Sequence, residues 1–280
     1  MSEPEAREPT GRDSADGVQA AVELRGVGLR YFSANGEMEA LRDISLRVDR
    51  GEFVSIIGPS GCGKSTVLSV IAGILRPTVG DVTVFGQAVT APSRRVGYML
   101  QQDYLLEWRT VLQNVLLGAE IHGVDLAVAH GRALSLLSQC GLATVANALP
   151  RELSGGMRQR VALARTLCTE PDVVLLDEPF SALDSQTRLA LADEVTAVLR
   201  QAGKTAILVT HDIGEAVSMS ERVIVMSRGP GRVKGEHPIR FGTSRDDNES
   251  RPSPMAARSA PNFGAYFEAL WRELDVHVRN

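Results

Sequence analysis

Apolar residues along the chain follow two spacings, one typical of buried strands and one typical of helices. The largely apolar stretch at residues 53–57 predicts a buried strand, and the continuous apolar run at 173–176 suits a central strand of a parallel sheet. The other predicted strands are 22–29, 44–48, 82–85, 96–100, 206–210 and 223–226. The predicted helices are 66–75, 157–167, 186–201 and 213–219. Because strands alternate with helices, we expect an α/β protein whose mainly parallel sheet is covered on both faces.

Residues 102–153 interrupt this alternation. Between about 110 and 149, apolar residues such as Val111, Val115 and Leu137 recur at helical spacing. We therefore expect two or three helices here, which form an all-helical subdomain inserted between strands of the core.

The two ends of the chain differ from the domain expected at residues 21–229. Residues 1–20 are mostly Glu, Pro, Ser, Gly and Asp, so we expect a disordered N-terminal tail. In the C-terminal tail, residues 230–280, the stretch 242–262 is rich in Ser, Pro, Arg and Asp, which predicts a loop or linker. The tail ends with apolar residues at helical spacing, which predict an amphipathic helix at about 262–275. That helix packs on this chain's own core or binds a partner, and we favour the first.

The composition is that of an ordinary globular protein, with 44% hydrophobic and 23% charged residues among 280. The net charge of −4 argues against a general attraction to nucleic acid or anionic lipid. No apolar run approaches the roughly 20 residues of a membrane span, and the acidic first residues are unlike a signal peptide. A role at a membrane would thus need another chain. Cys62, Cys140 and Cys168 have neither disulfide nor metal spacing, which indicates reduced cytosolic thiols.

The sharpest motif lies at residues 58–66, which fit the phosphate-loop pattern G-x-x-x-x-G-K-[ST]. They are Gly58, Pro59, Ser60, Gly61, Cys62, Gly63, Lys64, Ser65 and Thr66. Glycines let the backbone wrap a phosphate, and the following helix adds its positive N-terminal end. Lys64 can reach the β- and γ-phosphates of a nucleotide, and Ser65 can bind Mg²⁺. The strand before and the helix after disfavour an accidental glycine-rich turn.

Polar residues follow two other predicted strands. Asp177 and Glu178 come directly after 173–176, at the carboxyl end of a strand, where parallel sheets place their ligands. Asp177 suits Mg²⁺, whereas Glu178 is the candidate that orients and polarises an attacking water. His211 follows 206–210 in the same way, and we favour a γ-phosphate sensor over a packed or surface residue.

Other candidates carry weaker signals. Gln101 comes at the end of a predicted strand and could contact Mg²⁺ or the attacking water, with Gln102 as its rival. Tyr31 could stack on an adenine ring or pack in the core, and its spacing does not decide between them. Asp184 is the remaining polar candidate.

The segment Leu-Ser-Gly-Gly-Met at residues 153–157 predicts a second anion site. Ser154 is a good helix N-cap, and Gly155 and Gly156 offer free amides at the start of a helix. One chain has little need of two γ-phosphate sites. The segment therefore predicts a head-to-tail pair of chains that share two nucleotides.

Taken in order from about residue 22 to 231, these motifs resemble the ATP-binding cassette (ABC) family of transporter ATPases. The resemblance implies a P-loop NTPase core at 21–229, with an antiparallel β part on its N-terminal side and the helical subdomain at 102–153. It implies ATP and Mg²⁺ as cofactors. The implied roles are adenine stacking by Tyr31, the Walker A loop at 58–66, the Q-loop at Gln101, the signature at 153–157, Walker B at Asp177 and Glu178, the D-loop at Asp184 and the switch histidine at His211. The Leu-Leu-x-Trp at 105–108 favours Gln101 over Gln102.

Within the family the chain is similar to the importer branch for nitrate, alkanesulfonates and taurine, through residues 105–108, 153–160, 230–233 and 267–274. The resemblance implies a homodimer with ATP between its subunits, at the cytoplasmic face of the membrane. It also implies integral membrane permease subunits and an external solute-binding protein as partners, and no nucleic acid. Glu107 departs from the branch, which usually has Pro there. The alternative, an ABC ATPase acting on DNA or ribosomes, is disfavoured because such proteins usually carry long coiled coils or two cassettes.

Overall fold

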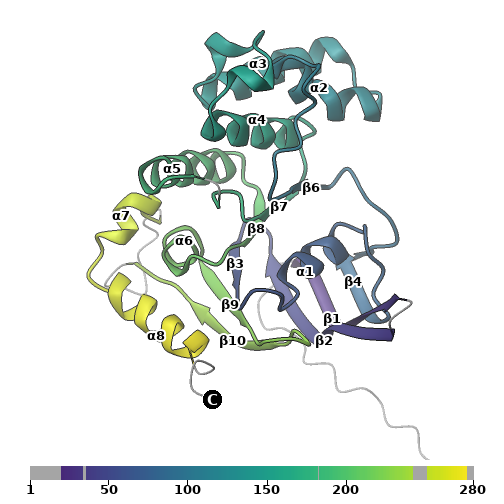
Figure 1. Cartoon of the computed structure of the whole chain (residues 1–280), viewed down its shortest axis with the longest axis vertical. Coiled ribbons are helices and arrows are strands. Elements are labelled where there is room, and N and C mark those ends of the chain that lie inside the picture. Colours follow the sequence, from purple (N-terminus) through teal and green to yellow (C-terminus); the bar gives the residue numbers. More distant parts are fainter. Residues whose placement is uncertain (1–19, 34–35, 182, 242–250, 276–280) are drawn as a thin grey trace, which may run out of the picture.

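The computed structural model describes residues 20–33, 36–181, 183–241 and 251–275 (Figure 1). Nearly all of the tail expected at 1–20 lies outside these residues, as do residues 242–250. Within the described part, no helix is long and apolar enough to cross a membrane.

A six-stranded sheet forms the centre of the molecule, in the order β10-β9-β3-β8-β7-β6. Its strands are β3 (Phe53–Ile57), β6 (Val96–Met99), β7 (Val173–Asp177), β8 (Thr205–Val209), β9 (Arg222–Met226) and β10 (Val233–Pro238). All neighbouring pairs are parallel except β10 with β9. The sheet is thus mainly parallel, as predicted, and the carboxyl ends of its parallel strands meet at one edge.

The central strands are buried at every position and mostly apolar because both of their faces are covered. On β7, Val173 and Leu175 pack into the cluster that includes helix α1 (Lys64–Ile71). Val174 and Leu176 point to the opposite face and pack with helices α4 (Gly155–Leu167) and α5 (Ser185–Gln201). Side chains alternate between the faces of a strand, so burial on both faces requires the continuous apolar run seen in the sequence.

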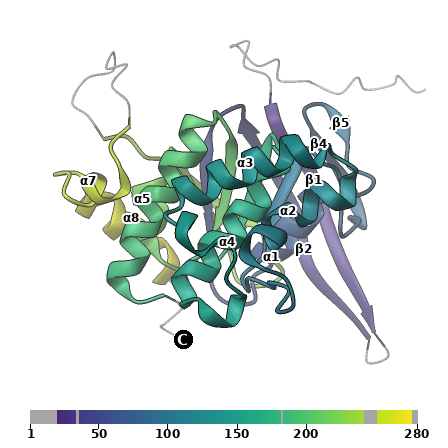
Figure 2. The same cartoon turned by 90° about the horizontal axis from the view of Figure 1, so that it is seen from above.

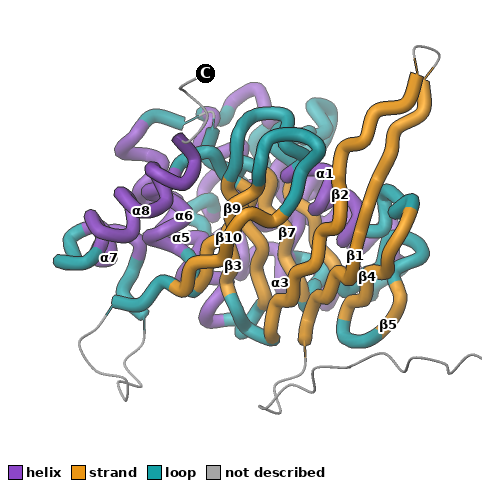
Figure 3. Tube along the Cα trace, turned by 90° about the horizontal axis from the view of Figure 1, so that it is seen from below, coloured by secondary structure: helices purple, strands orange, loops and turns teal. Residues whose placement is uncertain are grey.

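A second, antiparallel sheet has the order β2-β1-β4-β5. Its strands are β1 (Ala20–Ser33), β2 (Gly36–Asp49), β4 (Val79–Val84) and β5 (Gln87–Ala88). The β1–β2 hairpin stands out from the body of the molecule (Figures 2 and 3). The strands predicted at 22–29 and 44–48 were too short, because the outer part of the hairpin is exposed and its apolar and polar residues do not alternate. Phe32 is 74% exposed there, and Arg30 and Glu37 form an ion pair at 2.8 Å.

The helical subdomain forms a separate lobe above the central sheet in Figure 1. It contains α2 (Val111–His122), α3 (Leu126–Gln139) and two short 3₁₀ turns at Ala143–Val145 and Pro150–Glu152. Helix α4 packs against α2 and α3 although it begins after the predicted insert ends. A shared apolar core, which includes Val115, Leu137 and Val161, holds the three helices together.

The C-terminal part packs beside β9 and β10 through α6 (Ile213–Met219), α7 (Pro254–Arg258) and α8 (Phe263–Asp275). Leu270 of α8 is 1% exposed and packs into a cluster with Ile57 and Val217. The expected linker at 242–262 is wrong over its last part, where α7 forms. Its five residues are too few to show a helical period in the sequence.

Replacing Leu270 with Ala is expected to loosen α8. The substitution removes a buried side chain from the only fully buried position of the helix among the residues whose exposure is described. Cavity formation at such a site costs about 2–5 kcal/mol. Hydrogen exchange of the α8 amides measures this loss. Trp271→Ala serves as the control, since Trp271 is 53% exposed and should leave protection nearly unchanged. Equal protection in both variants would mean that Leu270 does not anchor the helix.

Candidate nucleotide-binding and hydrolysis site

A cavity of about 580 Å³ lies beside the phosphate loop, at the edge where the parallel strands end. Its lining comes from β1 and β2 of the antiparallel sheet, from the phosphate loop and α1, and from the segments that follow β7 and β9. The lining residues are Tyr31, Met38, Glu39, Ala40, Ser60, Gly61, Gly63, Lys64, Ser65, Thr66, Glu178, Gly229 and Pro230. Its volume falls within the ~300–1,000 Å³ range of small-molecule and cofactor sites.

The loop joins β3 to α1 and turns sharply at Gly63. Gly63 has φ +97°, and a Cβ there would lie 2.6 Å from Leu41 Cδ2. Both facts require glycine at this position. Gly63 is also the N-cap of α1 and has no side chain to cap the helix. The first-turn N–H groups therefore remain for an anion, and the helix dipole favours negative charge at this end.

The Lys64 side chain lies beneath the loop and is 7% exposed. Its Nζ donates to the carbonyl oxygens of Gly58 at 2.8 Å and Pro59 at 3.2 Å. The ammonium thus holds the two ends of the loop in place and puts a positive charge at the cavity. Cys62 behaves differently: its side chain is fully buried in the apolar core, and burial raises the pKa of its thiol.

Asp177 ends β7 and joins the loop through Ser65. Ser65 Oγ donates to Asp177 Oδ1 at 3.0 Å, and the Tyr98 hydroxyl donates to Oδ2 at 3.1 Å. Burial raises the pKa of both the Asp177 carboxyl and the Tyr98 hydroxyl. A hydroxyl and a carboxylate side by side are hard oxygen donors of the kind that Mg²⁺ prefers.

No group of three or more His, Cys, Asp or Glu residues suited to a metal ion occurs in the part of the chain that the structure describes. A cation next to Ser65 and Asp177 would therefore complete its shell with waters and nucleotide phosphates. This is the usual arrangement for Mg²⁺ in ATPases. The residues present fit such an ion.

Gln101 and His211 both contact Glu178, so three predicted site residues lie together. Gln101 Nε2 donates to Glu178 Oε2 at 3.1 Å, and His211 Nδ1 lies 3.2 Å from the same oxygen. Glu178 has φ +46°, a left-handed conformation rare for a residue with a side chain, and its N–H donates to Val209 O at 2.8 Å. Backbone strain of this kind persists where surrounding structure fixes it and clusters at functional sites.

Tyr31 lies at the cavity wall and not in the core. Its side chain is 37% exposed, and its hydroxyl is 3.4 Å from Thr66 Oγ1. This exposure excludes the core packing that its spacing left open, and adenine stacking stays a prediction.

The structure does not bring the signature segment to this cavity. Ser154 and Gly155 are exposed at the start of α4, and Ser154 Oγ accepts from Met157 N at 3.3 Å. Asp184 is also exposed and caps α5 by accepting from the N–H groups of Gln186 and Thr187, each at 3.1 Å. The hydrogen bonds from Thr187 lower the pKa of Asp184. Both segments are thus available on the surface.

The two surface segments are neighbours. A Cβ on Gly156 would lie 3.0 Å from Thr187 Cγ2, so the starts of α4 and α5 adjoin. A single partner surface can therefore contact the signature segment and Asp184 at once.

Sequence reasoning missed residues that reach the site from elsewhere in the chain. Tyr98 contacts Asp177 from β6, and Glu39 and Gly229 line the cavity from distant loops and strands. Tyr98 could have been found, since it lies on the predicted strand that ends at Gln101. For Glu39 and Gly229 the sequence holds no comparable signal, because only the packing of the two sheets brings them to the loop.

Comparisons with known proteins agree with the family resemblance of the motifs. The family model described as "ABC transporter" matches residues 41–181. An ABC transporter ATP-binding protein of Bacillus subtilis (strain 168) is 46% identical over 88% of this chain and 92% of its own length. A taurine import ATP-binding protein of Roseobacter denitrificans is 39% identical over 89% and 92%.

Solved structures agree in fold. A dimeric bacterial ABC transporter cassette is 34% identical, with a TM-score of 0.71 over 79% of this chain and 100% of its own. A post-hydrolysis cassette bound to ADP and Pi is 35% identical, with a TM-score of 0.70 over the same shares. The predicted P-loop NTPase fold is thereby confirmed. From its family match, its relatives and its fold, this chain belongs to the ABC transporter family, as an ATP-binding and ATP-hydrolysing subunit.

Proposed function

We propose that this chain powers the import of a small solute of the taurine, sulfonate or nitrate class. The observation that carries the ATPase part is the meeting of Gln101 and His211 on one carboxylate oxygen of Glu178, beside the phosphate loop. The importer part is supported by taurine import proteins at 39% and 40% identity to this chain.

Each residue of the cavity has a role in this proposal. Tyr31 stacks on the adenine ring, and residues 58–66 with the Lys64 ammonium hold the phosphates. Ser65, Asp177 and Gln101 would hold Mg²⁺, which would neutralise charge on the phosphates. Glu178 accepts a hydrogen bond from the attacking water and draws charge from it. His211 contacts the γ-phosphate. Because His211 also lies 3.2 Å from Glu178, its position links the presence of that phosphate to the Glu178 carboxylate.

The exposed signature segment supports a nucleotide-sandwiched homodimer. Ser154, Gly155 and Gly156 would hold the γ-phosphate of an ATP bound to the partner, and Asp184 would face the same interface. Ser154, Gly155 and Asp184 are exposed and lie away from this chain's own cavity, which supports that assignment, whereas Gly156 is buried at the start of α4. The dimeric cassette among the structural neighbours gives it a precedent.

The loop at residues 104–108 is the proposed docking surface for the membrane subunits. Trp108 is 76% exposed and Tyr104 60% exposed, an unusual display of aromatic rings for a surface without a partner. Arg158 of α4 ties this loop to the signature helix by pairing with Asp103 at 2.9 Å and Glu107 at 3.1 Å. Glu107 thus has a local partner in place of the rigidity that Pro would provide.

Removing the Trp108 ring tests this surface. Trp108→Ala is expected to reduce solute uptake about tenfold or more while the free subunit keeps its ATPase activity, because buried aromatic anchors dominate interface energetics. The measurement is taurine, alkanesulfonate and nitrate uptake in a deletion strain that carries each variant, beside ATPase activity of the purified chain. Met255→Ala is the control, since Met255 is exposed apolar surface on α7. Equal losses in both assays would contradict docking, and restored uptake of none of these solutes would contradict the importer class.

A further inference from the structure

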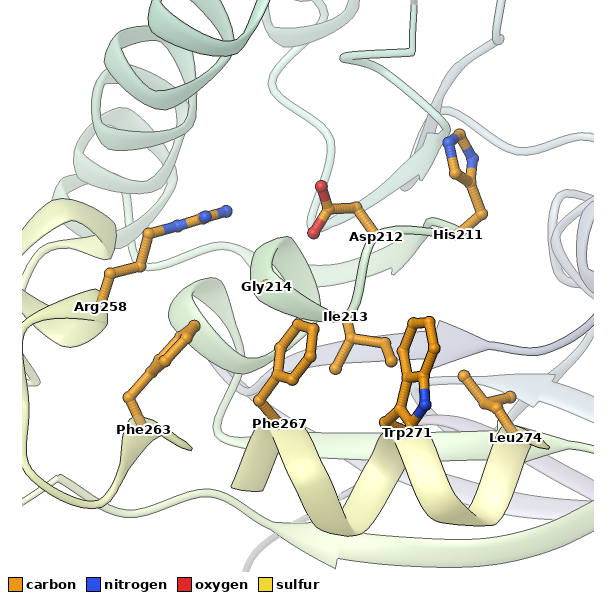
Figure 4. A pocket seen from close by; sticks show the side chains of 9 residues that line it. All are labelled: His211, Asp212, Ile213, Gly214, Arg258, Phe263, Phe267, Trp271 and Leu274. Atoms are coloured by element: carbon orange, nitrogen blue, oxygen red, sulfur yellow. The ribbon is translucent and has the colours of Figure 1, made fainter. Parts of the chain in front are cut away.

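A second cavity, of about 520 Å³, lies between α8 and the turn that follows β8 (Figure 4). It is separate from the phosphate loop but shares His211 with the hydrolysis site. Aromatic rings of α8 form one wall, the backbone of Gly214 contributes to the other, and Arg258 of α7 lies at one end. Nothing in the proposed function uses this cavity.

The aromatic wall consists of Phe263, Phe267 and Trp271, spaced four residues apart on one face of α8 (Figure 4). The ring centroids of Phe263 and Phe267 are 6.4 Å apart, and those of Phe267 and Trp271 are 6.2 Å apart and nearly parallel at 13°. Phe267 is 36% exposed and Trp271 53%, whereas Leu270 on another face anchors the helix. Phe263 packs against the same apolar cluster as Leu270, so docking of α8 accounts for that ring but not for Phe267 and Trp271.

Arg258 supplies a positive charge at the end of this wall. Each terminal nitrogen of its guanidinium is 3.1 Å from the position that a Cβ on Gly214 would occupy, so glycine lets the group lie against α6. Among the described residues, Arg258 forms no ion pair or hydrogen bond, and its Nε is buried without a partner. Asp212 also lines the cavity, but its oxygens accept from Arg188 Nη1 at 3.3 Å and Glu215 N at 3.0 Å.

From these features we propose that the cavity binds a small aromatic monoanion, a sulfonate or a carboxylate. The ring would lie against Phe267 and Trp271, and the anionic oxygens would accept hydrogen bonds from Arg258. A guanidinium presents parallel N–H donors that match such oxygens, and an aromatic wall with a few polar groups is typical of small-ligand sites. The volume suits a single substituted ring, and a purely apolar occupant would leave the Arg258 charge without a counterion.

The shared histidine gives the site a route to hydrolysis. His211 is 57% exposed at its side chain and contacts Glu178 while lining this cavity. A ligand that fills the cavity restricts the movement of the imidazole and so lowers ATP turnover. This coupling rests on the proposed function of His211, whereas binding of the anion does not.

Fluorine NMR of Trp271 tests the binding. The chain has two tryptophans, so 5-fluorotryptophan in a Trp108→Phe background reports Trp271 alone. Titration with toluene-4-sulfonate is expected to shift this resonance saturably. Methanesulfonate, which lacks the ring, and 4-methylbenzyl alcohol, which lacks the charge, should each bind about tenfold more weakly or worse.

Substitution of Arg258 separates the charge from the apolar groove. Arg258→Gln should weaken toluene-4-sulfonate about tenfold and leave the alcohol unaffected. Arg272→Gln is the matched control, since that side chain is 75% exposed and pairs with Glu268. Sulfonate binding that is as tight in Arg258→Gln as in the parent chain overturns the proposal. A Trp271 resonance that shifts with protein concentration and not with sulfonate also overturns it, because a second copy of the chain would then cover the wall.

ATPase assays test the coupling. Saturating toluene-4-sulfonate should lower turnover of the parent chain about fivefold, within the usual range of coupling between sites, and Arg258→Gln should resist it. If toluene-4-sulfonate binds the parent chain but leaves its ATP turnover unchanged, the regulatory role is overturned. Equal inhibition of the parent chain and of Arg258→Gln also overturns it. If the chain hydrolysed no ATP, the proposed function would fail, yet the NMR titration would still decide whether the site exists.

Discussion

Replacing Glu178 with Gln is expected to lower ATP turnover by about 10²–10⁴-fold, the usual contribution of a positioned general base, while ATP binding survives. Glutamine keeps the size of the side chain and a carbonyl oxygen for Gln101, but it cannot draw a proton from water. The 3.1 Å contact from Gln101 and the 3.2 Å contact from His211 both involve Glu178 Oε2, so the substitution changes chemistry at the meeting point of the site. Steady-state hydrolysis and nucleotide binding measure the two effects.

The same variant tests the shared-nucleotide dimer. If the signature segment of one chain holds the γ-phosphate bound to another, failure of hydrolysis leaves the two chains joined. Glu178→Gln should therefore accumulate as an ATP-dependent dimer on gel filtration, while the unmodified chain stays largely monomeric. Ser154→Arg, added to it, should abolish that dimer, because a bulky cation would fill the second anion site.

Controls separate these effects from general damage. Glu268→Gln removes an exposed carboxylate on α8, at 62% side-chain exposure, and should keep full turnover. A Glu178→Gln chain that retains normal turnover would remove Glu178 from the reaction. A chain with low turnover that stays monomeric with ATP would instead count against the sandwich while leaving the role of the carboxylate intact.

Much of the fold was predictable because burial imposes a period on the sequence. Strands β3 and β7 are covered on both faces, so each appears as an unbroken apolar run. The β1–β2 hairpin was underestimated because its outer half is solvated and has no apolar alternation. Helix α7 and strand β5 escaped notice because they are too short to show any period.

The location of the candidate site was predictable for a different reason. Parallel strands share a carboxyl edge, so residues that follow β7 and β8 had to lie near a loop that follows β3. The approach of Gln101 and His211 to one oxygen of Glu178 was not predictable, because it depends on the left-handed backbone at Glu178 and on side-chain torsions. The motif also does not distinguish loop residues that can face a phosphate from Cys62, whose thiol is buried in the core.

The faces of α8 illustrate what spacing alone leaves out. Its apolar residues predicted a helix that docks on the chain, and Leu270 does so. A helical period cannot say that Phe267 and Trp271 remain partly exposed, because exposure depends on how far the helix is rotated against α6. The cavity that Arg258 lines therefore depends on how α8 is rotated against α6.

Replacing Lys64 with Ala is expected to lower ATP turnover by about 10²–10³-fold, the usual effect of removing one preorganised group that stabilises transition-state charge. The substitution also weakens ATP binding, because the ammonium neutralises charge on the ground-state nucleotide. Nζ of Lys64 donates to the carbonyl oxygens of Gly58 and Pro59, so its loss frees the loop as well. The fold should survive, since the core clusters around α1 are apolar and do not depend on that charge.

Lys64→Met distinguishes the charge from the bulk of the side chain. Methionine fills most of the space of the buried stem but carries no proton donors, so its turnover should fall as far as that of the alanine variant. Lys204→Ala, at the turn before β8, is the control for loss of a lysine elsewhere. If Lys64→Met keeps the turnover and ATP affinity of the unmodified chain, the loop requires the packing of this side chain and not its ammonium.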